Sequence, residues 1–323
     1  MGWELNVAEA KDIYLAESDL WRYTQHFLMH SHHTTTYKYI LMKALLESLP
    51  EVSESGRLTF LQVTRHVTKI YWNLTVTYQL GQLNSKEKRS SLEQVIIEFQ
   101  RQHEIPREWN FDKIAEPQKA LLIKNVNDIF KKYVYGSFYK SFDGTIYSFH
   151  KKEGWLQLTA PYIVFFEKYK RILMNVTNYQ LALFLEKYNT KEAMEKILTK
   201  VEFVSARQSL SEFQVLLKQY GEERCFYCNR AVKKSHVDHF VPWSYVQNDV
   251  LWNFVLACSS CNSSKSNRLA HTEYLGELVA RNSRWLAFDQ METYSEKKLV
   301  HMYDYAIQNG FLGDWRPREG KRA

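Results

Sequence analysis

The stretch HVDHFVPWSYVQNDVLWNFVLACSSCNSSK, residues 236–265, joins a His-x-Asp-His cluster to a Cys-x-x-Cys-Asn sequence. The chain contains four cysteines, and they form two pairs, Cys225 with Cys228 and Cys258 with Cys261. Thiolates on two tight turns match the tetrahedral geometry of Zn²⁺. Buried or redox-active cysteines are the alternative, although the pattern uses all four. We therefore predict a structural zinc site, in which four thiolates leave no position for a catalytic water.

The zinc site has a consequence for the residues between the two cysteine pairs. When one ion ties both pairs together, the intervening chain must fold back as a short hairpin, and the residues after Cys261 begin a helix. This brings Asn262 back towards Asp238 and His239. We predict that these three side chains face a common cleft.

Length and charge suggest the organisation of the chain and its partner. A length of 323 residues predicts two domains, or one large domain with a smaller module. The net charge of +7 favours a polyanionic partner such as duplex DNA. The first residues lack the apolar core of a signal peptide, and no window has the apolar length that spans a bilayer. We expect a cytoplasmic protein that has no contact with membranes.

Residues 1–220 are predicted to form a mostly helical recognition or partner domain. Apolar residues recur at helical spacing from Tyr37 to Leu49, and Pro50 is expected to stop that helix. From Gly136, the segment GSFYKSFDGTIYSFHKKEGWLQLT alternates aromatic and polar residues on both sides of Asp143-Gly144. This alternation predicts a β-hairpin near residues 136–159.

The C-terminal part divides into two predicted segments. Residues 221–270 are short, turn-rich and carry the cysteines, whereas residues 271–323 return to helical patterning and end in a basic tail. The fold class predicted for the chain is mainly α with a small β-hairpin element, followed by a compact zinc-bearing module.

The motifs CFYC, VDHFVP and WNFVLACSSCN, followed by Lys265, closely resemble the HNH endonucleases, in the zinc-ribbon branch of the ββα-metal nucleases. The resemblance covers roughly residues 224–270 and implies a C-terminal ββα-metal module on a four-cysteine zinc ribbon. It also implies metal-dependent hydrolysis of DNA phosphodiester bonds. Two positions depart from the commoner family pattern, since Phe254 stands where Leu is more frequent and Asn262 stands where His is more frequent.

The resemblance implies roles for four residues of the module. His239 would be the general base that takes a proton from water. Asp238 and Asn262 would supply oxygen ligands to one catalytic cation, Mg²⁺ or Mn²⁺. Asn253 would brace the loop that carries His239 and hold its imidazole in orientation.

The resemblance and the position of the residues suggest that three further residues contact the DNA substrate. Lys265 and Arg268 would contact a phosphate near the start of the helix. His236 would be a substrate contact or an auxiliary ligand, because on a strand it shares a face with Asp238. A structural role for His236 is an equal alternative.

The biological setting follows less directly from the sequence. A helical domain ahead of an HNH module resembles bacterial restriction and anti-phage defence nucleases, in which the front domain reads the target or a partner protein. A mobile-element nuclease, a non-catalytic zinc-ribbon binding module and a scaffold with a vestigial nuclease remain alternatives. Residues 221–269 carry six Lys and Arg against four Asp and Glu, a surplus that four thiolates on one Zn²⁺ cancel. We therefore expect the helical domain or the basic tail to hold the DNA.

Overall fold

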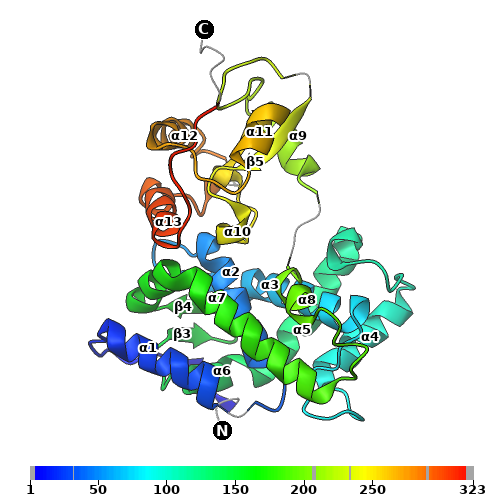
Figure 1. Cartoon of the computed structure of the whole chain (residues 1–323). Coiled ribbons are helices and arrows are strands. Elements are labelled where there is room, and N and C mark those ends of the chain that lie inside the picture. The colour runs from blue at the N-terminus through cyan, green and yellow to red at the C-terminus, as the bar shows by residue number, and fades with distance from the viewer. Residues whose placement is uncertain (1–3, 32, 206–208, 233, 289–290, 318–323) are drawn as a thin grey trace. The chain divides into compact units, whose positions relative to one another are not determined.

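The structure is a computed structural model that describes residues 4–31, 33–205, 209–232, 234–288 and 291–317. The chain forms two compact units, Met1–Arg207 and Gln208–Ala323 (Figure 1). The boundary lies before the predicted one at residue 220, because helix α9 (Ser211–Gln219) packs on the strands of the second unit. In the part of the chain that is described, no helix has both the length and the hydrophobicity needed to cross a membrane.

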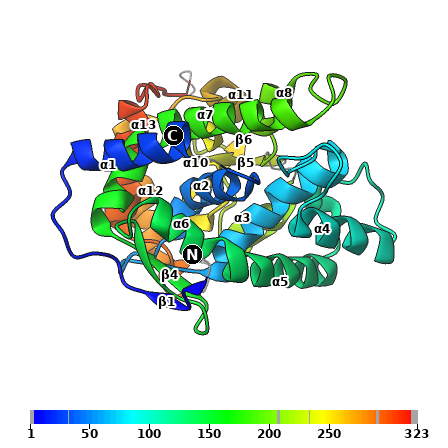
Figure 2. The same ribbon diagram turned by 90° about the horizontal axis from the view of Figure 1, so that it is seen from below.

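The first unit is mostly helical, as predicted, and α2 (Tyr37–Ser48) lies at its centre. Figure 2 shows α2 between α3 and α7, and both helices pack against it. Every residue from Tyr39 to Ser48 is buried, so the helix is enclosed on all sides, and not along one stripe only. The remaining helices of this unit are α1 (Glu17–Gln25), α3 (Phe60–Trp72), α4 (Ser91–Gln102), α5 (Glu116–Tyr133), α6 (Tyr135–Ser141), α7 (Ala160–Tyr188) and α8 (Ile197–Glu202).

The described residues also form five short helical turns. The predicted stop at Pro50 falls inside one of them, directly after α2. Two are π-helical, His26–His30 and Asn73–Thr77, and three are 3₁₀ turns, Leu49–Glu51, Phe111–Lys113 and Leu251–Asn253.

A four-stranded antiparallel sheet lies in the first unit, with strand order β1-β3-β4-β2. The predicted hairpin is present as β3 (Tyr147–His150) and β4 (Trp155–Leu158), with Tyr147 opposite Leu158. Its turn contains Gly154, whose φ of 79° requires the left-handed region. The edge strands are β1 (Val7–Ala8) and β2 (Arg57–Thr59).

Asp143 and Gly144 do form a turn, but the prediction that it is the turn of the β-hairpin was wrong. The residues before it form helix α6, because Phe138 and Phe142 lie four apart and bury their rings together, with centroids 5.0 Å apart. Asp143 and Gly144 have φ values of 49° and 73°, so they end this helix in the left-handed region. The spacing of the aromatic residues is compatible with the alternation of a strand and with the repeat of a helix. Burial of the rings in the core favours the helix.

The second unit is built on a two-stranded antiparallel sheet, β5 (Ser235–His239) with β6 (Phe254–Cys258). Helix α11 (Ser259–Lys265) follows β6 without a loop and packs on both strands, which gives the order ββα. The short helix α10 (Trp243–Val246) lies between the strands in the sequence.

The C-terminal helices α12 (Thr272–Arg284) and α13 (Glu296–Gln308) share the hydrophobic core of this ββα motif. The Arg281 guanidinium donates to the carbonyl of Phe254 at 2.7 Å, and the Asn282 amide donates to that of Trp252 at 2.8 Å. Residues 271–317 therefore belong to the same folded unit as the cysteines. The last residues of the predicted basic tail, 318–323, lie outside the described residues.

Candidate functional site

The four cysteines meet at one point of the second unit. Their Sγ atoms lie within 4.8 Å of one another, and those of Cys228 and Cys258 are 3.8 Å apart. Thiolates held about 2.3 Å from one Zn²⁺ in a tetrahedron are separated by about 3.8 Å, so the cluster suits zinc. Because all four donors are sulfur, the chemistry of the site also fits this metal.

Local backbone geometry makes this cluster. The first pair lies on a turn in which the Cys225 amide donates to the carbonyl of Arg230 at 2.9 Å and the Asn229 amide donates to the carbonyl of Cys225 at 2.8 Å. In the second pair, Cys258 ends β6 and caps α11, because its Sγ accepts the amide of Cys261 at 3.4 Å. Each pair is thus set by contacts within a few residues.

The thiols do not share one electrostatic environment. Burial raises the pKa of Cys225 and of Cys261. Burial also acts on Cys258, but hydrogen bonds from Cys261, first of all from its amide, lower the pKa of that thiol. A cation is needed to hold four neighbouring sulfurs as thiolates, since their mutual repulsion opposes ionisation.

Asp238 lies near the end of β5 and receives two donors on one oxygen. The Tyr227 hydroxyl donates to its Oδ2 at 2.6 Å, and the Lys265 ammonium lies 2.9 Å from the same atom. Lys265 also donates to the carbonyl of His239 at 2.7 Å and is fully buried. These contacts tie α11 to β5.

This environment differs from the one expected for Lys265. A phosphate contact needs an accessible ammonium, whereas the structure places this group in the core, as the ion-pair partner of Asp238. The sequence also offered no sign of the part that Tyr227 plays. Its position inside the CFYC motif indicated a turn only, and the contact with Asp238 depends on how that turn packs against β5.

His239 ends β5 and is almost fully buried. Its Nε2 lies 2.8 Å from Oδ1 of Asp249, and its ring packs edge-on against Phe254 with centroids 4.6 Å apart. Because a carboxylate only accepts, Nε2 is the donor, and the neutral ring then has its lone pair on Nδ1. Sequence reasoning missed Asp249, which lies in a loop and belongs to none of the recognised motifs.

Asn253 is buried directly behind the loop that follows β5. Its side-chain amide donates to the carbonyl of Val241 and its Oδ1 accepts the amide of the same residue, both at 2.9 Å. Its own carbonyl accepts the amide of Phe240 at 2.8 Å. Three hydrogen bonds therefore hold the two residues that come after His239.

Asn262 lies on α11, three residues before Lys265, so the two side chains project from the same side of the helix. Lys265 contacts Asp238 on β5, and Asn262 is half-buried. Arg268 is exposed and donates to the carbonyl of Ser264 at 2.8 Å. His236 is half-buried on β5 opposite Ala257.

Replacing Tyr227 by phenylalanine tests the contact with Asp238. Burial and the charge of Asp238 raise the pKa of Tyr227 well above its ordinary value, so this hydroxyl remains a donor at neutral pH. We expect Tyr227→Phe to lower the free energy of unfolding by about 1–2 kcal/mol and Mn²⁺ affinity by about tenfold. Chemical denaturation and calorimetric Mn²⁺ titration measure the two quantities.

The matched control is Tyr303→Phe, because that buried hydroxyl donates to the carbonyl of Ala270 at 2.6 Å and not to Asp238. It should lose similar stability and keep its Mn²⁺ affinity. Equal Mn²⁺ affinity in wild type and Tyr227→Phe would show that the hydroxyl does not position Asp238.

Comparison with known families gives one match, HNH endonuclease, over residues 225–268. The matched segment contains both cysteine pairs, β5, β6 and α11, and it lies within the predicted range of 224–270. Neither the curated proteins nor the solved structures gave a significant match. The prediction of an HNH endonuclease domain with a cysteine cluster suited to zinc is confirmed.

Proposed function

We propose that this protein is a metal-dependent HNH endodeoxyribonuclease that hydrolyses phosphodiester bonds of duplex DNA. The observation that carries the proposal is the packing of α11 on β5 through the bond between Lys265 and Asp238. This packing brings the helix that carries Asn262 against the strand that carries Asp238 and His239. The presence of a proton acceptor and two oxygen donors in one small motif supports the proposal.

The divalent cation would be held by oxygens of Asp238 and Asn262. Carboxylate and amide oxygens are the ligands that Mg²⁺ and Mn²⁺ prefer, so the donor set fits. When bound, such a cation supplies positive charge that stabilises a phosphate and its leaving oxygen. Lys265 is assigned to holding Asp238 in place, and the exposed Arg268 is the better candidate for a phosphate contact. His236 keeps its proposed place as an auxiliary ligand or substrate contact, since it shares a strand face with Asp238.

His239 is the proposed general base that takes a proton from a water molecule. The carboxylate of Asp249 holds Nε2 of the ring and stabilises the imidazolium that forms. Asn253 keeps the following residues in place through its bonds to Val241. The catalytic set is therefore His239, Asp238 and Asn262, with Asn253 and Asp249 as positioning residues.

A plasmid-nicking assay tests this function. Supercoiled DNA incubated with the protein is expected to be nicked when Mg²⁺ or Mn²⁺ is present and to stay intact in EDTA at a concentration that spares the zinc. Product ends should carry 5′ phosphates. DNA binding without cleavage under every cation would support a non-catalytic zinc-ribbon module instead.

Binding of DNA is assigned mainly to the first unit. Residues 1–207 contain 28 Lys and Arg against 23 Asp and Glu, a net charge of +5, whereas residues 208–323 contain 15 against 13, a net charge of +2. Zinc bound by four thiolates adds about −2 to the second unit and cancels its surplus. Because affinity for DNA depends on the number of phosphates that the protein neutralises, the first unit should supply most of it.

Deleting residues 1–200 is expected to lower affinity for duplex DNA by about 100-fold or more and to flatten its salt dependence. Fluorescence anisotropy over a series of salt concentrations measures both effects. Zinc content of the fragment serves as the folding control, since the second unit has its own core. A zinc-loaded fragment with full affinity would contradict the assignment.

The proposed setting is DNA restriction or anti-phage defence, with the helical unit selecting the target or a partner protein. One HNH site cuts one strand, so a double-strand break requires a second copy of the chain or a second event. Plaque assays with wild type and the His239→Ala variant test the setting, because protection that survives the loss of the base would not come from cleavage.

A further inference from the structure

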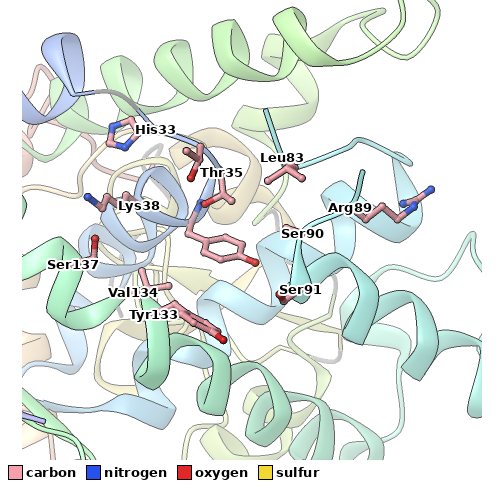
Figure 3. Close-up of a pocket in the computed structure, with 12 residues that line it drawn as sticks. His33, Thr35, Lys38, Leu83, Arg89, Ser90, Ser91, Tyr133, Val134 and Ser137 are labelled. Atoms are coloured by element: carbon pink, nitrogen blue, oxygen red, sulfur yellow. The ribbon is translucent and has the colours of Figure 1, made fainter. Parts of the chain in front are cut away.

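A pocket of about 450 Å³ lies in the first unit, and none of the residues assigned above lines it. It is formed by the start of α2, the segment that leads into α4, and the junction of α5 with α6. Figure 3 shows His33, Lys38 and Ser137 at one end and Ser90, Ser91 and Arg89 at the other. This volume lies in the range of sites for small molecules.

The lining of the pocket is cationic. It includes Lys38 and Arg89, and none of its residues is an aspartate or glutamate. The Arg89 guanidinium points away from the pocket in Figure 3 and lies 3.9 Å from Glu93, so Arg89 contributes to the rim. Lys38 is therefore the cation that belongs to the pocket itself.

Lys38 lacks a counter-charge among the described residues. Its ammonium donates to the hydroxyl of Ser141 at 2.8 Å, and no described carboxylate lies within 4.0 Å of it. The side chain is half-buried, and burial lowers the pKa of its ammonium. A partly desolvated cation without an anion is costly, and an anionic ligand would remove that cost.

The opposite end of the pocket offers neutral donors. The Ser90 hydroxyl caps α4 by accepting the amide of Glu93, and the amide of Leu92 donates to the Tyr37 hydroxyl. No described acceptor binds the amide of Ser91, the first residue of this helix. Amide and hydroxyl donors here suit the polar edge of a ligand.

Two tyrosines, Tyr37 and Tyr133, also line the pocket. The Tyr37 ring packs against Tyr71 and Phe130, with centroids 5.8 Å and 5.9 Å away, so its position is fixed by the core. Tyr133 ends α5 and is 39% exposed. Aromatic faces bind planar rings, and a nucleobase gains about 1–3 kcal/mol from such stacking.

We propose that this pocket binds a nucleotide, with a phosphate at Lys38 and the base against Tyr133. The combination of an uncompensated lysine, neutral donors and tyrosine faces within one pocket carries the proposal. The nucleotide is either a free mononucleotide or one unit of a nucleic-acid strand, since both present the same phosphate and base. The proposal does not depend on the nuclease assignment.

Calorimetric titration of the full chain tests this site without added divalent cation, which keeps the nuclease site from binding phosphate through a metal. The probes are AMP, dTMP, adenosine and inorganic phosphate. We expect AMP or dTMP to bind at least about tenfold more tightly than adenosine, because a charged hydrogen bond to Lys38 adds to stacking. A wild-type protein that binds adenosine as well as AMP would overturn the proposal.

Two variants separate the contributions of charge and stacking. Lys38→Met should reduce nucleotide affinity to the level of adenosine, whereas Tyr133→Ala should weaken nucleotide and adenosine alike. Lys124→Met, at an exposed lysine on α5, is the control and should bind as wild type. Retention of the preference for AMP in a folded Lys38→Met protein would refute the phosphate position, and circular dichroism establishes folding.

Titration with the oligonucleotide dT8 distinguishes a free mononucleotide from one unit of a nucleic-acid strand. If dT8 binds more than about tenfold more tightly than dTMP and Lys38→Met abolishes the difference, the nucleotide belongs to a strand. Equal affinities that both depend on Lys38 identify a free nucleotide as the ligand. Binding of dT8 that is unaffected by Lys38→Met and Tyr133→Ala would place the strand elsewhere and count against the pocket.

Discussion

Replacing His239 by alanine is expected to lower the rate of plasmid nicking by about 10²–10⁴-fold. The imidazole is the group at the end of β5 that can take a proton near neutral pH, and Asp249 holds its Nε2 at 2.8 Å. The variant leaves Asp238, Asn262 and the cysteine cluster in place. Initial rates with Mg²⁺ and with Mn²⁺, at saturating protein, measure the loss.

Two comparisons make the result for His239 specific. Duplex affinity, measured by anisotropy, should not change, because the imidazole is almost fully buried. His301→Ala, at an exposed histidine on α13, is the control and should nick at the wild-type rate. Nicking by His239→Ala at the wild-type rate would exclude His239 as the base and remove the main support for a hydrolytic site here.

Loss of the zinc is expected to unfold the second unit and to leave the first unit folded. Structural zinc sites contribute about 10–16 kcal/mol in small zinc domains, which exceeds the stability of most domains. In this chain the ion would join the turn at Cys225 to the start of α11, and both flank the sheet that carries Asp238 and His239. The variant Cys228→Ser, or a strong chelator, should therefore abolish nicking.

Hydrogen exchange followed by mass spectrometry measures this effect separately for each unit. Peptides from β5, β6 and α11 should lose protection in Cys228→Ser, while peptides from α2 and α3 should keep it, since the first unit has a separate core. Ser260→Ala, at an exposed position between the second pair of cysteines, is the control. Zinc analysis should give one ion per chain in wild type and control. Protection of β5 that persists without zinc would show that the ion is not structural.

The helical part of the fold was predictable where the pattern was local. The apolar spacing from Tyr37 to Leu49 determined α2, and Pro50 marked its end to within two residues. The same reasoning misplaced the hairpin turn, because alternating aromatics between Gly136 and Asp143 also fit a helix. Burial of Phe138 and Phe142 in the core decided between the two.

The sequence by itself determined the cysteine cluster and indicated the candidate site residues. Four sulfurs in two short turns and an Asp-His pair are local features, and the family model covers them without any knowledge of packing. The geometry of a Cys-x-x-Cys turn depends on a few backbone hydrogen bonds, so spacing alone is a sufficient signal.

Only the tertiary structure decided what surrounds those residues. The bond from Tyr227 to Asp238, the contact of Asp249 with His239 and the burial of Lys265 each join segments whose approach depends on packing. The sequence alone does not distinguish a lysine that contacts a phosphate from one that contacts a buried carboxylate. Which one it meets is decided by the helix face that packs against the strand, because burial of a charge is favourable only where a partner lies within reach.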